Sequence, residues 1–276
     1  AENEEVWQRI VQLAGGKGAR VVVFGTASED PEASAKAQSL CDSRLQIIHS
    51  SFANIEQHIQ RASVDAVLLD LGISSPQIDT PERGFSFRFE GPLDMRMDTT
   101  EVTTAADIVN QASEIEIAQI LREYSDEKFA GRIARAIVSA RPIHTTSELA
   151  DIVASAIPAP ARRRGGHPAK RTFQALRISL NKELEILPNA IDSAVRRTGS
   201  GGRVAVLSYH SGEDRIIKAR FKQHATGGCE CPSQLPCGCG AQRTVRLVRV
   251  ASKPSAVEQE KNPRSTSARL RVADVI

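Results

Sequence analysis

Short apolar runs rich in β-branched residues alternate with amphipathic stretches in the first part of this chain. The runs ARVVVFG (19–25), LQIIHSSF (45–52) and DAVLLDLG (65–72) each lead into small or polar residues, and the segments 32–40 and 53–62 between them are compatible with helices. Strands that alternate with helices predict a parallel sheet covered on both faces, with ligands at the carboxyl ends of the strands. The sequence therefore predicts the α/β class.

The alternation stops after residue 103. Four segments within 104–158 have helical periodicity, and each begins near a Thr, Ser or Asp that suits an N-cap. The segment 172–195 is typical of one long amphipathic helix, and strand-like runs return at 202–210, 244–250 and 268–276. We therefore expect an all-helical domain inserted into the sheet domain. The expected parts are residues 1–103 (sheet domain, first part), 104–171 (inserted helical, substrate-binding domain) and 172–276 (sheet domain, second part).

The run that ends at Asp70 places polar groups where a parallel sheet offers them to a ligand. Asp70 is followed by Gly72, which permits a tight turn, and then by Ser74, Ser75 and Gln77. These side chains would project donors and acceptors around the crevice at the strand ends. Capping of a following helix by Asp70 or Ser74 is the alternative role.

The segment DTPERGFSFRFEGPLDMRMD (79–98) has the periodicity of neither a helix nor a strand, yet it holds three of the eight phenylalanines. Long irregular segments in compact domains are often functional. Arginines there could bind phosphates, and phenylalanines could stack on an unpaired base, although phenylalanines more often belong to a core. The candidates are Arg83, Arg88 and Arg96 for phosphates and Phe85, Phe87 and Phe89 for stacking.

Positive charge is concentrated rather than large, because the formal net charge is only +3. The stretch ARRRGGHPAKR (161–171) contains five cationic residues and no acid. Single-sign stretches of this kind suit phosphate contacts, because each neutralised phosphate releases counterions; a solvated surface loop is the alternative. The candidate contacts are Arg162, Arg163, Arg164, Lys170 and Arg171.

Four of the five cysteines lie within the eleven residues CECPSQLPCGC. Four thiolates satisfy a tetrahedral zinc ion, although the C-x-C spacing is tighter than the usual C-x2-C pair. The chain shows no secretion signal, so zinc is a better prediction than a disulfide framework, with a loop of unliganded thiols as the alternative. The candidate ligands are Cys229, Cys231, Cys237 and Cys239.

No apolar run approaches the roughly 18 to 20 residues that a membrane span requires. With 41% hydrophobic residues, the chain can bury a sizeable core. We therefore expect a soluble cytoplasmic protein without a membrane partner. The oligomeric state stays open, with a dimer among the options.

Four blocks of the sequence, in order, resemble a known family: LLDLGISSPQIDTPERGFSFRFEGPLDMRMD (68–98), HPAKRTFQALRISLNKEL (167–184), GGRVAVLSYHSGEDRIIK (201–218) and NPRSTSARLRV (262–272). They are similar to the signature blocks of the ribosomal RNA small subunit methyltransferase H family, also called RsmH or MraW. The resemblance implies a Rossmann-like methyltransferase sheet with an inserted all-helical domain. It also implies methyl transfer from S-adenosylmethionine to the N4 amino group of a cytosine in the decoding centre of 16S rRNA, in the small ribosomal subunit.

The resemblance also implies roles for individual residues. Asp70 and Gln77 correspond to cofactor contacts, and Phe52 corresponds to the residue beside the adenine, although a plain core role for Phe52 is equally expected. Asp70 with the GISS turn would help to place the cytosine amine. The candidates that would assist at the next strand end are His210, Glu213 and Asp214. For His210, capping of the following helix is the alternative role.

Departures from the family pattern leave open whether the chain is a truncated enzyme or a degenerate family member, and they motivate a second hypothesis. The chain begins AENEEVWQRIVQLAGGKG, so the first family strand and its glycine-rich turn of the type D-G-T-x-G-x-G-G-H are expected to be missing. Ser28 stands where an acid usually binds the cofactor ribose, and Gly212 stands where a leucine is usual. Each lost hydrogen bond would cost about 0.5 to 1.5 kcal/mol. The second hypothesis is a non-catalytic RNA-binding or ribosome-assembly protein that retains the fold but has lost cofactor binding.

Overall fold

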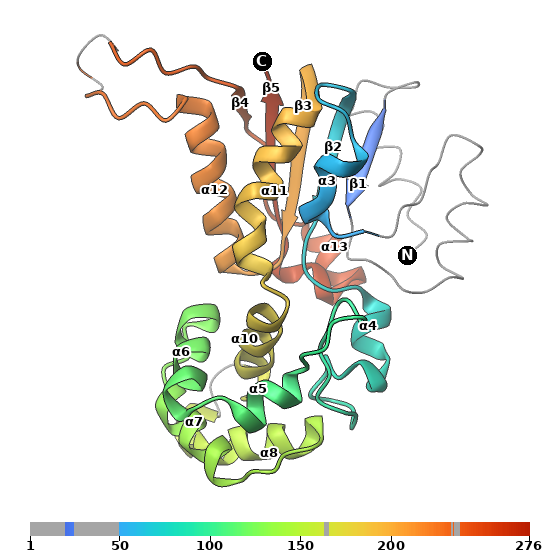
Figure 1. Ribbon diagram of the computed structural model, residues 1–276, viewed down its shortest axis with the longest axis vertical. Helices are drawn as coiled ribbons and strands as arrows, with labels where there is room; N and C mark the ends of the chain where they lie inside the picture. Colours follow the sequence, from blue (N-terminus) through green and yellow to red (C-terminus); the bar gives the residue numbers. More distant parts are fainter. Residues whose placement is uncertain (1–19, 25–49, 163–165, 233, 235–237) are drawn as a thin grey trace, which may run out of the picture. The chain divides into compact units, whose positions relative to one another are not determined.

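The computed structural model describes residues 20–24, 50–162, 166–232, 234 and 238–276 (Figure 1). The chain divides into two compact units. We call residues 1–72 with 184–276 the sheet unit, and residues 73–183 the helical unit. Among the described residues, no helix is both long enough and apolar enough to cross a bilayer.

The sheet unit contains a five-stranded sheet in the order β1-β2-β3-β5-β4. Strands β1, β2 and β3 are parallel, whereas β5 is antiparallel to β3 and β4 is antiparallel to β5. This mixed sheet confirms the predicted α/β class. Residues 45–49 of one expected strand lie outside the described residues. The bounds are Val21–Phe24 for β1, Val64–Asp70 for β2, Thr198–Ser208 for β3, Val245–Val248 for β4 and Arg269–Val275 for β5.

Helices pack against this sheet and enclose one core. Four of the seven residues of β2 are buried, as expected for a parallel strand covered on both faces. Apolar side chains of β2 and β3 share the core with Leu187 and Ile191 of α11 and with Ile217 and Phe221 of α12. The helices that lie wholly or mostly in this unit are η1 (Phe52–Asn54), α3 (Ile55–His58), α11 (Glu183–Arg197), α12 (Ser211–Thr226), α13 (Ala256–Lys261) and η3 (Pro263–Ser267).

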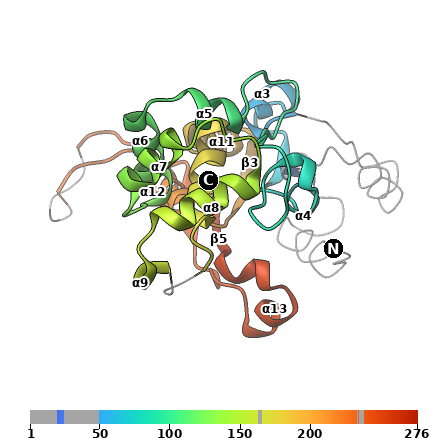
Figure 2. The same cartoon turned by 90° about the horizontal axis from the view of Figure 1, so that it is seen from below.

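The helical unit has a core of its own, and α6, α7 and α8 pack side by side (Figure 2). Side chains of Thr104, Ser113 and Thr145 cap α5, α6 and α8, which confirms those three N-caps. The cap of α7 differs, because its N-cap position is Phe129, whose N–H donates to the carboxylate of Glu127. The bounds are Ser75–Asp79 (α4), Pro81–Arg83 (η2), Ala105–Gln111 (α5), Glu114–Ser125 (α6), Ala130–Ser139 (α7), Thr146–Ala156 (α8), Ala159–Arg162 (α9) and Lys170–Leu180 (α10).

The helical unit is larger than the expected insertion of residues 104–171. It begins at Ile73 because the irregular segment 79–98 is part of its core. Phe85, Leu93 and Met95 are buried in one cluster with the helices. The segment is therefore anchored by apolar packing, although it contains little regular structure.

The expected single helix over 172–195 is two helices, so that prediction was wrong. α10 ends at Leu180, and Lys182 has a positive φ of 51° before α11 begins. The Asn181 side chain ends the first helix, because its amide donates to the carbonyl of Met95 at 2.9 Å and accepts from the N–H of Met97 at 2.7 Å. These bonds to a distant segment replace the continued helical pattern.

Candidate active site

The carboxyl ends of β2 and β3 lie at the same edge of the sheet. Asp70 pairs in parallel register with Leu207, so the residues that follow Ser208 emerge beside the end of β2. Gly72 turns the chain with a φ of 92°, and a Cβ at this position would lie 3.3 Å from the Tyr209 ring. A parallel sheet of this type presents its ligand-binding residues at this edge.

Asp70 and Tyr209 form a hydrogen-bonded pair at this edge. The phenolic O–H of Tyr209 donates to Oδ1 of Asp70 at 2.9 Å. Burial raises the pKa of the Asp70 carboxyl above its ordinary value, the Tyr209 hydrogen bond partly opposes this shift, and the negative charge of Glu213 adds to it. Burial and the neighbouring Asp70 carboxylate also raise the pKa of Tyr209, so Tyr209 stays a donor. Asp70 is therefore a half-buried carboxylate whose pKa is raised by burial.

Glu213 anchors the loop between β3 and α12. Only 2% of its surface is exposed, and its Oε2 accepts from the backbone N–H groups of Tyr209 at 2.8 Å and of His210 at 3.2 Å. A carboxylate at a helix N-terminus is also favoured by the helix dipole. Glu213 therefore holds the backbone that carries Tyr209.

His210 occupies the N-cap position of α12, which is the alternative role expected for it. Its Nε2 lies 3.4 Å from Oε1 of Glu213, and this buried nitrogen makes no hydrogen bond to any described residue. A Cβ at Gly212 would lie 3.1 Å from Nδ1 of the same ring. A larger side chain at position 212 would therefore require this ring to move.

Asp214, unlike Asp70, is held by basic side chains. Its carboxylate accepts from Nε of Arg271 at 2.7 Å and lies 3.0 Å from Nζ of Lys218. Burial alone would raise the pKa of Asp214, but the hydrogen bonds from Arg271 and Lys218 outweigh it and lower the pKa. Asp214 thus joins α12 to β5 and is committed to an ion pair.

Among the expected cofactor contacts, Gln77 has the most informative surroundings. Its Oε1 accepts from Ser74 N at 3.0 Å in the capping box of α4. Its Nε2 is buried and makes no hydrogen bond to any described residue, so a donor is available for a ligand acceptor. Phe52 is half-buried and packs against the sheet core. Ser28 and the expected glycine-turn region before residue 20 lie outside the described residues.

The expected RNA-binding arginines of the segment 79–98 differ in their surroundings. Arg96 forms a bidentate pair with Asp94 at 2.8 and 2.7 Å, and it also donates to the Thr99 carbonyl at 3.0 Å. Arg83 donates to the Arg96 carbonyl at 2.7 Å. These two guanidinium groups hold their own loop. The exposed cationic candidates are Arg88, Arg162, Lys170 and Arg171, whereas Arg163 and Arg164 lie outside the described residues.

An aromatic stack was not predicted from the sequence. The exposed ring of His167 stacks on Phe87, with 4.5 Å between centroids and 14° between planes, and Phe87 meets Phe173 edge to face. Phe85 is buried, and Phe89 is 45% exposed. The only signal for the stack was the place of His167 in the basic stretch. Tyr209 was also missed, because its partner lies 139 residues away in the sequence.

Three of the four expected zinc ligands come together. The sulfur atoms of Cys229, Cys231 and Cys239 all lie within 4.8 Å of one another. Cys237 lies outside the described residues. The cluster is in the sheet unit, on the segment that joins α12 to β4.

Comparisons with known proteins agree with this architecture. A model of the MraW methylase family matches residues 20–276. The chain is similar to proteins named ribosomal RNA small subunit methyltransferase H. That of Halothermothrix orenii is 49% identical over 240 residues, which cover 84% of this chain and 77% of the relative. That of Nitrosospira multiformis is 46% identical over 272 residues, or 95% and 85% of the two chains. That of Heliobacterium modesticaldum is 44% identical over 281 residues, or 97% and 88%. This chain therefore belongs to the MraW methylase family.

Proposed function

We propose that this protein transfers a methyl group from S-adenosylmethionine to the N4 amino group of a cytosine in the decoding centre of 16S rRNA, in the small ribosomal subunit. Family membership supports methyl transfer, and the names of its relatives support a ribosomal RNA substrate. The single observation that carries the assignment to a site is the Asp70–Tyr209 pair at the carboxyl edge of the sheet. Such a substrate places the activity in the cytoplasm.

The reaction needs a protein group that manages a proton. The cytosine amine is a poor nucleophile, because its lone pair is delocalised into the ring. When bound, S-adenosylmethionine supplies an electrophilic methyl group on a sulfonium sulfur. Transfer of that methyl group to the amine would leave the nitrogen with one proton to lose. A positioned carboxylate can accept hydrogen bonds from the amine and then take that proton.

Asp70 fits this task by its hydrogen-bonding capacity. Tyr209 occupies Oδ1, and no other described side chain donates to the carboxylate, so Oδ2 can accept from the amine. The raised pKa makes this carboxylate a stronger proton acceptor than an exposed aspartate. In this proposal Tyr209 and Glu213 are positioning residues, because they orient Asp70 and its loop. His210 stays a proposed assisting residue, supported by its buried Nε2.

Cofactor contacts are proposed from each unit separately. In the sheet unit, Asp70 and Phe52 are candidates, and the half-buried aromatic ring of Phe52 could cover a purine. In the helical unit, the buried Nε2 of Gln77 offers a donor that no described residue uses. Ser28 remains a proposed contact on sequence grounds.

The helical unit is the proposed RNA-binding part. Arg88, Arg162, Lys170 and Arg171 are exposed and can neutralise phosphates. The exposed His167 ring, already stacked on Phe87, provides a flat surface on which an unpaired base can lie. Enzymes that modify a base must take it out of the helical stack, so a platform for an unstacked base suits this substrate.

Two measurements on the full chain test this proposal. Calorimetric titration with S-adenosylmethionine should show saturable binding at micromolar ligand. Transfer of tritiated methyl to unmethylated small subunits should appear as labelled N4-methylcytidine after digestion of the RNA to nucleosides, and Asp70→Asn should lower its rate by about 10²-fold or more. The matched control is Asp151→Asn, an exposed aspartate of α8. If S-adenosylmethionine binds but no methyl group is transferred, the catalytic proposal is wrong. No heat at millimolar ligand, together with retained RNA binding, would establish the non-catalytic RNA-binding hypothesis instead.

A further inference from the structure

The segment 227–244, which we call the cysteine segment, lies far from the candidate active site within the sheet unit. α12 begins beside the carboxyl end of β3 and runs back along the sheet. β4 then starts at Val245, which pairs with Val275. The neighbouring Asp274 pairs with Arg203 of β3, and Arg203 lies beside Ala66 near the start of β2. The cysteine segment therefore projects from the edge opposite Asp70 (orange, upper left in Figure 1).

The described residues of the cysteine segment form no apolar core. Among its described residues none is buried, and its described cysteines are half-buried (Cys229 and Cys231) or exposed (Cys239). Cysteine used only for packing is normally among the most buried residues. Short segments that cannot bury apolar surface are commonly held by cross-links or metal ions. Packing therefore does not explain why this segment is rich in cysteine.

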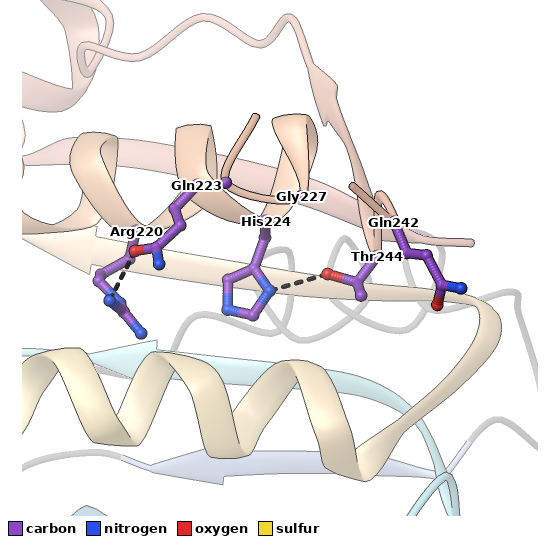
Figure 3. Close-up of a pocket in the computed structure, with 7 residues that line it drawn as sticks. Arg220, Gln223, His224, Gly227, Gln242 and Thr244 are labelled. Atoms are coloured by element: carbon purple, nitrogen blue, oxygen red, sulfur yellow. Dashed lines mark hydrogen bonds between the residues drawn. The ribbon is translucent and has the colours of Figure 1, made fainter. Parts of the chain in front are cut away.

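Hydrogen bonds hold the two arms of the segment together at its base (Figure 3). Nδ1 of His224 lies 2.8 Å from Oγ1 of Thr244, and the Thr244 N–H donates to the His224 carbonyl at 3.0 Å. A Cβ at Gly227 would lie 2.5 Å from the Gln242 carbonyl oxygen, so the arms also approach closely there. The base is thus anchored by the protein itself, and the cysteines lie beyond it.

The three thiols are arranged to connect the arms. Cys229 and Cys231 follow α12 directly, and Cys239 lies on the returning arm. Their sulfur atoms lie within 4.8 Å of one another, whereas three sulfurs on one tetrahedral zinc ion, each at about 2.3 Å, would be separated by about 3.8 Å. A contraction of about 1 Å or less closes the set around an ion.

We propose that Cys229, Cys231 and Cys239 bind one structural zinc ion that cross-links the two arms of the cysteine segment. Each thiol loses its proton to solvent as its sulfur bonds to the ion, so binding weakens at low pH. Thiolate ligands favour zinc over the harder magnesium and calcium ions. Since the site lies at the opposite edge of the sheet from Asp70, the ion orders the segment and takes no part in methyl transfer.

The test measures metal content and coordination in the full chain. Protein purified with reductant, loaded with zinc chloride and dialysed should retain about one zinc ion per chain. Replacement by cobalt should give the intense visible bands of tetrahedral thiolate coordination. The variants Cys229→Ser, Cys231→Ser and Cys239→Ser should each lose most of the metal, whereas Cys41→Ser, the cysteine outside the cluster, should keep it. Calorimetric S-adenosylmethionine affinity should be the same in all four variants, which separates this proposal from the proposed function.

A second readout does not depend on the variants. Removal of zinc from the wild-type protein with a chelator should increase protease cleavage within 227–244 and leave cleavage of the helical unit unchanged. The proposal would be overturned by wild-type protein that retains no zinc after loading, or by cysteine variants that bind as much zinc as wild type. Retention of iron with sulfide, of copper, or oxidation of these thiols to a disulfide in the purified protein would also overturn it.

Discussion

Asp70 in the sheet unit and Arg96 in the helical unit are both partly buried charged side chains, but their hydrogen-bonding capacity is used differently. Arg96 donates from all three guanidinium nitrogens to its own loop, including the carboxylate of Asp94 and the carbonyls of Thr99 and Glu101. Asp70 accepts one hydrogen bond, from Tyr209, and no other described side chain donates to its carboxylate.

The difference separates residues that hold the fold from residues that are available to a ligand. A buried polar group normally finds all its partners within the protein, because an unmade hydrogen bond costs free energy. Arg96 follows this rule. Asp70 departs from it at the edge of a sheet where ligands bind, and its raised pKa reflects that departure.

The largest expected effect comes from removing the Asp70 carboxylate. Asp70→Ala should lower the rate of methyl transfer by about 10²-fold to 10⁴-fold, because a general base contributes on this scale. Single-turnover transfer of tritiated methyl measures it. If Asp70→Ala transfers methyl as fast as the exposed control Asp151→Asn, the unused hydrogen-bonding capacity of Asp70 has no role in the reaction.

The stability of an Asp70 variant provides a second test of the difference between Asp70 and Arg96. The folded-state pKa of Asp70 is raised, so its ionised form costs stability at pH values above the ordinary aspartate pKa of about 3.9. Asp70→Asn should therefore be more stable than wild type at neutral pH, and the difference should vanish at low pH. Thermal unfolding between about pH 3.5 and 7.5 measures this difference in stability. The range begins near the ordinary aspartate pKa of about 3.9. If Asp70→Asn were less stable than wild type at neutral pH, burial of the ionised carboxylate would not cost stability, and this explanation of the raised Asp70 pKa would be wrong.

Arg96→Ala should act on stability rather than on RNA contacts. Loss of a charged group with several hydrogen bonds should lower the free energy of unfolding of the helical unit by about 2 to 3 kcal/mol. Burial alone would raise the pKa of Asp94, but the Arg96 hydrogen bonds outweigh it and lower the pKa. The pair therefore stabilises above the ordinary aspartate pKa and loses its effect as pH falls through the lowered value. Urea unfolding at two pH values measures both effects.

The exposed cations, unlike Arg96, should affect RNA binding rather than stability. The double variant Lys170→Ala with Arg171→Ala should weaken binding of decoding-centre RNA about tenfold and reduce the salt dependence of binding, with little change in stability. Filter binding at several salt concentrations measures it, with Arg96→Ala as the comparison at a temperature where that variant is folded. If the salt dependence of RNA binding is unchanged in the double variant, Lys170 and Arg171 do not contact the RNA phosphates.

The smallest expected effect is that of Tyr209→Phe. The Tyr209 hydrogen bond lowers the pKa of Asp70, so its loss should raise that pKa further and shift the acidic limb of the kcat/KM profile to higher pH. The rate should fall a few-fold at mildly acidic pH and recover at alkaline pH, with a stability loss of about 1 kcal/mol. A uniform loss at all pH values would indicate a structural role only.

Several elements could be predicted because their causes are local. The apolar runs at 65–72 and 202–210 correspond to β2 and β3, and Thr104, Ser113 and Thr145 cap their helices through residues three positions ahead. Asp70 could be placed at a strand end for the same reason. Hydrophobic periodicity and capping depend on neighbours within one helical turn, so they can be read without knowledge of the fold.

Other features depended on residues that are distant in sequence. The Asn181 side chain ends α10 through a local bond to the Arg177 carbonyl and through bonds to the distant loop at Met95 and Met97, and only the distant bonds required coordinates. The use of Arg96 within its own loop and the His167–Phe87 stack also required coordinates.

The sequence by itself determined the α/β class, the positions of most strands and helices, and the presence of an acid at the end of β2. Only the tertiary structure decided which charges are used by the protein itself and which are left for a ligand. The register between β2 and β3 brings Tyr209 to Asp70 across 139 residues, and burial at that edge then raises the pKa of the carboxylate. Both register and burial depend on the whole packed unit, because neighbouring residues alone set neither of them.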